Sequence, residues 1–446
     1  MPHNVPPLNY PSQKRGHPSL SPRPKFRHPL SLFLLTLANY GLMYTANILL
    51  ARELEVEAFD DYSVAVSVVT MLSTFATLGL EKYALRAVAL FRERRDWPAY
   101  RGYWVFSLLT IAGTSLALIA LVGIGLELMQ MRTQQSTGLH IAIILFSCYL
   151  PFIGVSQFLV ETLAVQGAFL ISVLIYRLFL PGIYLLSLAA LLASSIKPSA
   201  EAAVICLGTS WALAFIILWA INHTLTPYAA RHALPEFRIK KWLSRSLPLV
   251  MNSLMMSMMT SGGVVIMELI HPSGLEVGIY AVAAQTGGFI SLIGTSTNRY
   301  FLPMIVVMTE HRNPAGLRAI LHKKSAILGG LILSLLAVIF FYGEAILDLF
   351  GDQFAQGYLT LSIIACGASF SALFADVPYY LQFMGRHRLV LRLTLLAVLS
   401  MWIISAILGP EFGPVGVAIA YAAPVIVLFS SLRIVAAMHL KRLESM

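Results

Sequence analysis

The chain is divided into apolar segments that are each long enough to cross a lipid bilayer. A transmembrane helix needs about 20 residues to span a hydrocarbon core of about 30 Å. Charged residues make up 12% of the chain, whereas a soluble domain carries about 25%. We therefore predict an all-α, polytopic membrane protein with about 12 transmembrane helices. The expected spans cover residues 30–51, 62–81, 103–127, 139–161, 169–194, 201–222, 247–270, 278–303, 325–346, 357–381, 389–409 and 412–438.

The basic residues alternate between the loops that these spans define. Of the 31 Lys and Arg residues, 27 fall on one side of the membrane in this topology, and only Arg52, Arg132 and Lys197 fall on the other. Because cytoplasmic loops carry the excess of Lys and Arg, both termini are predicted to be cytoplasmic. The net charge of +10 is thus explained by topology and by contact with anionic membrane lipids. It does not indicate a nucleic-acid partner.

No loop is long enough to fold as a separate soluble domain, so the organisation follows the helices. The segment 1–29 is basic and Pro-rich and lacks the apolar stretch of a signal peptide, which indicates a disordered cytoplasmic tail. Six spans precede the segment 223–246 and six follow it, so both halves enter the membrane in the same direction, as in a parallel pseudo-twofold repeat. The predicted parts are a tail at 1–29, an N-terminal six-helix lobe at 30–222, a cytoplasmic linker at 223–246, a C-terminal six-helix lobe at 247–438 and a cytoplasmic tail at 439–446.

A sparse internal repeat between the two halves supports this duplication. The segment 57–65 matches 275–283, with Tyr62 aligned to Tyr280. Polar positions further along the same helices align at the same offset: Ser67 with Gln285, Ser73 with Ser291, Thr77 with Thr295, and Glu81 with Arg299.

Polar stripes run along spans one, two, seven and eight, which are the matching members of the two halves. Polar atoms that face lipid are costly, so these faces should point at one another or at water. The alternative is ordinary packing, because small polar residues let membrane helices approach closely. We predict a hydrated cavity between the halves. Its candidate substrate-binding residues are Asn39, Asn47, Ser67, Thr70, Thr74, Thr77, Ser257, Thr260, Gln285, Ser291, Thr295 and Asn298.

Ionisable residues near or within the spans give sharper candidates. Glu81 and Arg299 occupy equivalent positions at the cytoplasmic ends of spans two and eight, which suggests an ion-paired gate; the alternative is that both extend to the membrane interface. Arg177 lies within span five and is predicted to pair with Glu161 or to bind substrate. Arg52 is a further substrate-binding candidate, or it pairs with the acidic residues that follow it.

Three carboxylates are candidates for binding a coupling ion, with a structural hydrogen-bonded role as the alternative. They are Glu268, Asp376 and Glu161. We expect no cofactor, but coupling to a proton or sodium gradient. The sequence contains no phosphate-binding loop, no His-Glu-x-x-His motif and no Cys and His cluster, so we do not expect an enzyme or a metal site.

Four stretches resemble the polysaccharide (O-antigen-type) flippases of the multidrug, oligosaccharidyl-lipid and polysaccharide exporter superfamily. These stretches are 46–81, the motif Leu275-Glu276-Val277-Gly278-Ile279-Tyr280, 349–354 and 413–420. The first copy departs from the family pattern, because Asp60 and Asp61 stand where members usually carry a glycine before the tyrosine.

The resemblance implies a V-shaped bundle of two six-helix lobes in the bacterial inner membrane, with a lumen formed by helices one, two, seven and eight. It further implies a polyprenyl-diphosphate-linked glycan as cargo, cationic lumen residues for the diphosphate, and a polysaccharide polymerase and glycosyltransferases as partners. By position, the cationic residues are Arg52, Arg177 and Arg299. An ion-coupled multidrug exporter with an acidic centre at Glu268 and Asp376 is the alternative function. A membrane-embedded glycan polymerase or ligase is a more distant one, because the loops are too short to form a catalytic face.

Overall fold

The computed structural model describes residues 29–130, 137–194, 197–272, 274–310, 314–383 and 385–444. Within these ranges, side chains are described except at 29–32, 129–130, 137, 295–310, 314–321, 383 and 439–444. The described residues form helices joined by short turns and contain no strand, which confirms the all-α prediction.

The helices divide into two series along the chain. The first series is α1 (Pro29–Glu53), α2 (Val56–Ala76), α3 (Leu80–Glu93), α4 (Trp97–Gln130), α5 (Thr137–Ser147), α6 (Leu150–Val165), α7 (Phe169–Leu174), the π-helix η1 (Ile175–Phe179), α8 (Leu180–Leu192), α9 (Ala200–Leu225) and α10 (Tyr228–His232). The second is α11 (Ile239–Ile270), α12 (Leu275–Glu310), α13 (Pro314–Asp348), the 3-10 helix η2 (Asp352–Gly357), α14 (Tyr358–Leu373), α15 (Val377–Phe383) and α16 (His387–Glu444).

The predicted number of spans is confirmed once two bent elements are taken into account. Among the described residues, 10 helices are long and apolar enough to cross a membrane, and the bent pair Gly138–Ser147 and Leu150–Val165 makes an eleventh. The last of the ten, His387–Met438, has 52 residues; this is about 78 Å at 1.5 Å per residue, more than twice the bilayer core. Gly413, with φ 53° and ψ −134°, interrupts its helical backbone, so α16 supplies two spans.

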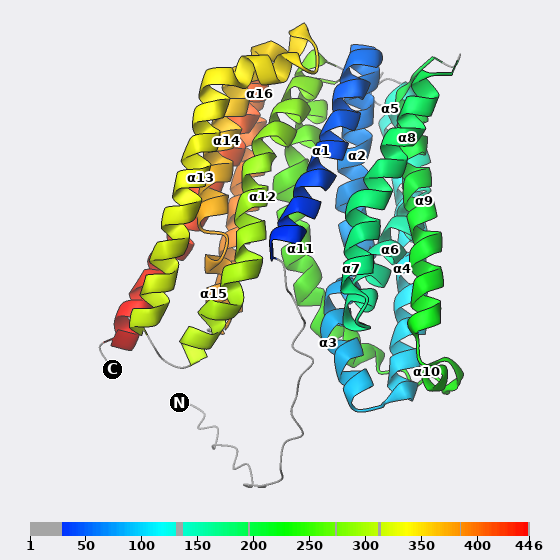
Figure 1. Ribbon diagram of the computed structural model, residues 1–446. Helices are drawn as coiled ribbons and strands as arrows, with labels where there is room; N and C mark the ends of the chain where they lie inside the picture. The colour runs from blue at the N-terminus through cyan, green and yellow to red at the C-terminus, as the bar shows by residue number, and fades with distance from the viewer. Residues whose placement is uncertain are drawn as a thin grey trace.

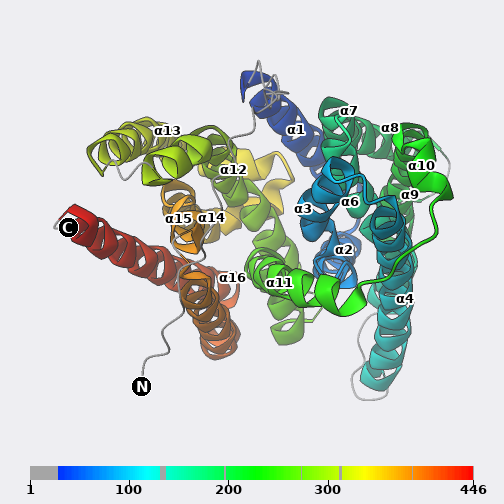
Figure 2. The ribbon, with the colours of Figure 1, turned by 90° about the horizontal axis from the view of Figure 1, so that it is seen from below.

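The two series form two lobes. In Figure 1, α1 to α9 lie on one side and α12 to α16 on the other, with α11 between them; the view in Figure 2 separates the same groups. We call the end that holds the α1–α2 turn the upper end and the end that holds α3 and α10 the lower end. The lower end is the one that the distribution of basic residues predicts to be cytoplasmic.

The helices with polar stripes meet between the lobes. α2 packs against α11 and α12, and α1 packs against α12. At the upper end aromatic rings join the lobes: Tyr44 and Phe350 have centroids 5.1 Å apart, and Phe59 and Phe354 have centroids 5.6 Å apart. Large apolar side chains on the outer faces remain exposed, as in Leu109 at 68%, and this is expected of surfaces that face lipid.

A left-handed turn between α2 and α3 brings the lower part of α11 against the N-terminal lobe. Leu78 and Gly79 have φ of 47° and 71°. A Cβ on Gly79 would lie 2.5 Å from the Ser246 carbonyl oxygen, so only glycine allows this approach. α11 starts at Ile239 rather than at the predicted 247, because this extra length packs on α3.

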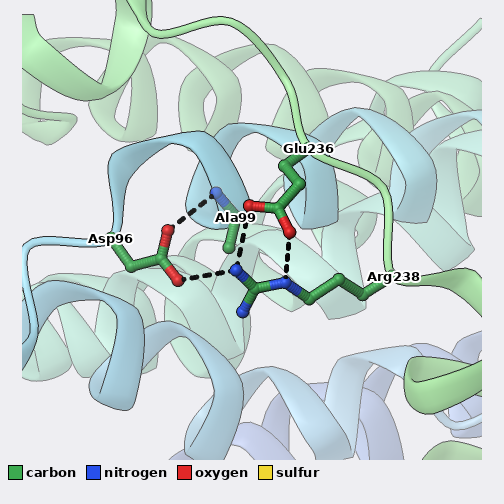
Figure 3. A network of polar contacts seen from close by, with 4 residues as sticks. All are labelled: Asp96, Ala99, Glu236 and Arg238. Atoms are coloured by element: carbon green, nitrogen blue, oxygen red, sulfur yellow. Dashed lines mark hydrogen bonds and ion pairs between the residues drawn. The ribbon is translucent and has the colours of Figure 1, made fainter.

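The segment before α11 is fixed to the start of α4, as Figure 3 shows. Arg238 forms ion pairs with Glu236 (2.7 Å) and with Asp96 (3.2 Å). Asp96 also accepts a hydrogen bond from the Ala99 N–H at 3.3 Å, and the Glu236 N–H donates to the Pro98 carbonyl. These contacts hold the connection between the lobes at the lower end.

Candidate functional site

A cavity of about 510 Å³ lies between the lobes. The N-terminal lobe contributes residues of α2, α3, α6, α7 and η1, and the other wall comes from α11 and α15. The polar side chains in its lining are Thr74, Glu81, Lys82, Gln157, Glu161, Ser172, Tyr176, Arg177, Asn252, Ser253 and Tyr379. The cavity therefore combines hydroxyl, amide and charged groups within a helical membrane bundle.

Arg177 reaches this cavity from a π-helical turn. Pro181 at the start of α8 has no N–H, and its ring would clash with the carbonyl four residues earlier, which is that of Arg177. The chain adopts a wider turn over Ile175–Phe179, and the Leu180 N–H bonds the Ile175 carbonyl five residues back. Single π-turns of this kind are frequent at functional sites. Arg177, which was predicted as a cationic lumen residue, therefore lies in a π-helical turn.

Carboxylates and a lysine occupy the same cavity. Glu81 is 5% exposed, and Glu161 forms an ion pair with Lys82 over 3.5 Å. Two carboxylates and two cations therefore face one cavity, and the lining has no net charge. No group of three or more His, Cys, Asp or Glu in the described part of the chain could hold a metal ion.

Above the cavity, predicted lumen residues bind one another and join the lobes. Asn47 Nδ2 donates to Gln285 Oε1 at 3.0 Å, and the hydroxyls of Tyr44 and Thr286 are 3.1 Å apart. The Tyr40 hydroxyl donates to the Gln285 carbonyl. We call these contacts between α1 and α12 the upper seam.

Several of the other predicted polar residues form hydrogen bonds within their own helix or within one lobe. Ser291 and Ser371 hydroxyls are 3.2 Å apart inside the C-terminal lobe. Thr74, Thr77 and Thr260 donate to carbonyls of their own helices. Asn39, Ser67 and Ser257 are half-buried, and Thr70 is exposed. Of the predicted polar lumen residues whose side chains are described, Thr74 lines the cavity; a lumen role for the others stays a prediction.

The remaining charged candidates lie away from the cavity. Arg52 Nε donates to the Leu349 carbonyl at 2.7 Å, at the end of α13, so it joins the lobes at the upper end instead of pairing with the carboxylates beside it. Asp376 binds Lys324 at 2.5 Å, and the two side chains are 6% and 1% exposed. Lys324, expected in a cytoplasmic loop, is therefore inside the C-terminal lobe. Glu268 is 4% exposed and lies near the upper end of α11.

The side chains of Thr295, Asn298 and Arg299 lie outside the described residues, so the predicted Glu81 and Arg299 gate stays a prediction. The polar lining also includes residues that were not predicted, among them Lys82, Ser172, Tyr176, Asn252 and Tyr379. Asn252 is next to Ser253 on the polar face of α11, so this position could have been identified from the sequence. The two tyrosines could not, because aromatic residues are common throughout the chain.

Comparisons with known proteins agree with this architecture. The model of the family described as polysaccharide biosynthesis protein matches residues 27–309. No curated protein matches the sequence. Among solved structures, an inward-facing multidrug resistance MATE family transporter of the MOP superfamily has 15% identity and a TM-score of 0.75, with 94% of this chain and 98% of that chain covered. The lipid II flippase MurJ, in an inward closed conformation, has 16% identity and a TM-score of 0.69, with 92% and 87% covered.

Proposed function

The chain belongs to the polysaccharide biosynthesis protein family, and we propose that it moves a polyprenyl-diphosphate-linked oligosaccharide from the cytoplasmic to the periplasmic leaflet by alternating access. A headgroup of sugars and diphosphate cannot cross hydrocarbon unaided. The protein must therefore offer a polar path while the polyprenyl tail stays in lipid.

The observation that carries this proposal is the composition of the cavity between the lobes. Asn252, Ser253 and Gln157 supply amide and hydroxyl groups that suit the hydroxyls of sugars. Arg177 supplies a planar guanidinium that can bind phosphate oxygens in pairs. The upper seam joins the lobes above this cavity, so the conformation is that of a carrier with its upper end closed. By the positive-inside prediction, the cavity then serves the cytoplasmic leaflet.

A multidrug exporter is the second candidate function, and the likeness to a MATE transporter favours it. The acidic centre expected for such an exporter is not assembled, because Asp376 binds Lys324 inside the C-terminal lobe. Glu268 does not line the cavity either. The carboxylates that do line it are balanced by Lys82 and Arg177, which disfavours a purely cationic substrate.

The proposal is tested by depleting the protein and measuring lipid-linked oligosaccharide on each leaflet of the membrane. We expect the oligosaccharide to accumulate on the cytoplasmic leaflet, where glycosyltransferases assemble it, and to fall on the periplasmic side, where a polymerase would use it. Unchanged leaflet distributions together with loss of drug efflux would support the exporter instead.

A further inference from the structure

Two residues that the internal repeat aligns with one another are in contact across the lobes. Asp60 on α2 and Gly278 on α12 occupy the same position in the two copies of the repeat. A Cβ added to Gly278 would lie 2.3 Å from Asp60 Oδ1. The carboxyl group of one half therefore occupies space that the glycine of the other half leaves open. This acidic residue is also where the chain departs from the family pattern.

The Asp60 carboxyl is enclosed. The residue is 0% exposed, and among the described residues neither carboxyl oxygen has a hydrogen-bond partner. The Gly278 N–H acts on it electrostatically but does not meet the geometry of a hydrogen bond. On the C-terminal lobe, the rest of the contact surface includes the Phe354 ring, 3.2 Å from the same Cβ position.

Among the described residues, the charged groups that act on Asp60 are carboxylates. α11 contributes Glu268, which is 4% exposed, and α2 itself contributes Glu57 and Asp61. α12 and η2 contribute the glycine and the aromatic ring already described. Burial removes this carboxyl group from bulk water, and no cation among the described residues acts on it. Both losses disfavour the charged form, and burial outweighs the Gly278 N–H, which favours it. The enclosed carboxyl is therefore expected to carry a proton.

We propose that Asp60 is the proton-binding group that couples protonation to closure of the upper end. The inference rests on the alternating access of the proposed function, but not on the identity of the cargo. When the lobes separate at the upper end, Asp60 loses its contact with Gly278 and meets water, where it ionises. A ligand that binds one of two conformations more tightly shifts the population toward that conformation. The proton is this ligand, so low pH on the upper side favours the closed form.

The test follows the distance between the upper ends of the lobes as pH changes. Spin labels are attached to cysteines at Glu127 of α4 and Glu411 of α16, both exposed, after Cys148, Cys206 and Cys366 are replaced by alanine. The protein is measured in lipid nanodiscs without substrate, so a different cargo would not affect the result. We expect the open population to rise with pH. Asp60→Asn should stay closed across the range, because its amide cannot ionise.

Glu53→Gln is the matched control, since it removes an exposed carboxylate beside the α1–α2 turn that is not among the charges acting on Asp60, and it should keep the pH dependence. Glu268→Gln should weaken the dependence, because one of the charges that repel an ionised Asp60 is gone; it also serves if Asp60→Asn fails to fold. Gly278→Ala should raise the open population at every pH, because the added Cβ collides with the carboxyl. Unchanged pH dependence in Asp60→Asn, or closure driven by sodium at constant pH, would overturn the proposal.

Discussion

Asn47 of α1 donates a hydrogen bond to the side-chain oxygen of Gln285 of α12 over 3.0 Å. Asn47 Oδ1 accepts a hydrogen bond from the Tyr62 hydroxyl at 3.3 Å, and that hydroxyl lies 2.7 Å from the hydroxyl of Tyr184. A polar network thus runs from α8 through α2 and α1 into the second lobe. Polar side chains that suggested a wet lumen are used here to hold the lobes together, so they must separate if the upper end opens.

Crosslinking this pair should arrest transport. With the three native cysteines replaced, Asn47→Cys and Gln285→Cys are joined by a short thiol-reactive crosslinker that a reducing agent can cleave. We expect transport of the lipid-linked glycan to fall to background when the crosslink forms and to recover when it is cleaved, because the upper seam can no longer separate.

The control uses a pair at a similar distance inside one lobe. Ser291 and Ser371 have hydroxyls 3.2 Å apart on α12 and α14. A crosslink between cysteines at these positions should leave transport largely intact, because the lobe moves as a unit. If the crosslink across the seam did not inhibit transport, the lobes would not separate there.

Replacing Arg177 should weaken binding of a diphosphate headgroup. A hydrogen bond to a charged group contributes about 1.5–3 kcal/mol, so Arg177→Ala should reduce affinity roughly 10- to 100-fold, at 1.4 kcal/mol for each factor of 10. Arg177→Lys should recover part of the loss, because it keeps the charge but not the paired geometry. Binding of a short-chain polyprenyl-diphosphate sugar is measured by isothermal titration calorimetry. The exposed Arg388 is the matched control, and equal losses for Arg388→Ala would indicate a general charge effect.

The sequence predicted the class, the two-lobe organisation and the helices that meet, because hydropathy and charge act along the chain. The hydrogen-bond partner of each polar side chain was harder to predict. Asn47 and Gln285 were predicted as binding residues from the same polarity that makes them good partners for one another. Periodicity identifies the face of a helix but not whether that face meets water or another helix.

Two further positions depend on three-dimensional contacts that no single segment encodes. The burial of Asp60 needs Gly278, which lies in the other half of the chain. The pairing of Lys324 with Asp376 was missed because a lysine near the end of a span is normally a topology signal. In the structure its ammonium group has a partner inside the lobe, which favours the structural role for Asp376 over binding of a coupling ion.

Removing one partner of this pair should destabilise the protein. Lys324→Met leaves a buried carboxylate without its cation, which costs about 3–5 kcal/mol. The double variant Lys324→Met with Asp376→Leu should regain most of the stability, because neither charge then remains buried. Thermal unfolding of the purified protein in detergent measures both effects. A double variant that unfolds as early as the single variant would show that the pair is not simply structural, and retained transport in the double variant would exclude Asp376 as the coupling group.

The last prediction concerns the connection at the lower end that Figure 3 shows. A Cβ on Gly102 would lie 1.9 Å from the Glu236 carbonyl oxygen, so Gly102→Ala should displace the connection and cost about 1–3 kcal/mol. Arg238→Ala should cost less, about 1 kcal/mol or under, because its ion pairs with Glu236 and Asp96 are near the surface. Thermal unfolding at neutral pH compares the two variants, with Arg388→Ala as the control for loss of an exposed arginine.

The cost of Arg238→Ala should also depend on pH. Hydrogen bonds from Arg238 hold the pKa of Glu236 below its ordinary value of 4.5. A carboxyl group whose pKa is lowered in the folded state stabilises the fold above its unfolded pKa, and the contribution is lost as pH falls through the folded pKa. The melting temperatures of wild type and Arg238→Ala should therefore differ at pH 7 and converge as the solution is acidified below 4.5. Gly102→Ala should show no such convergence, since a steric collision does not titrate. A difference for Arg238→Ala that persisted unchanged in acid would mean that packing of the arginine side chain, and not its charge, fixes the connection.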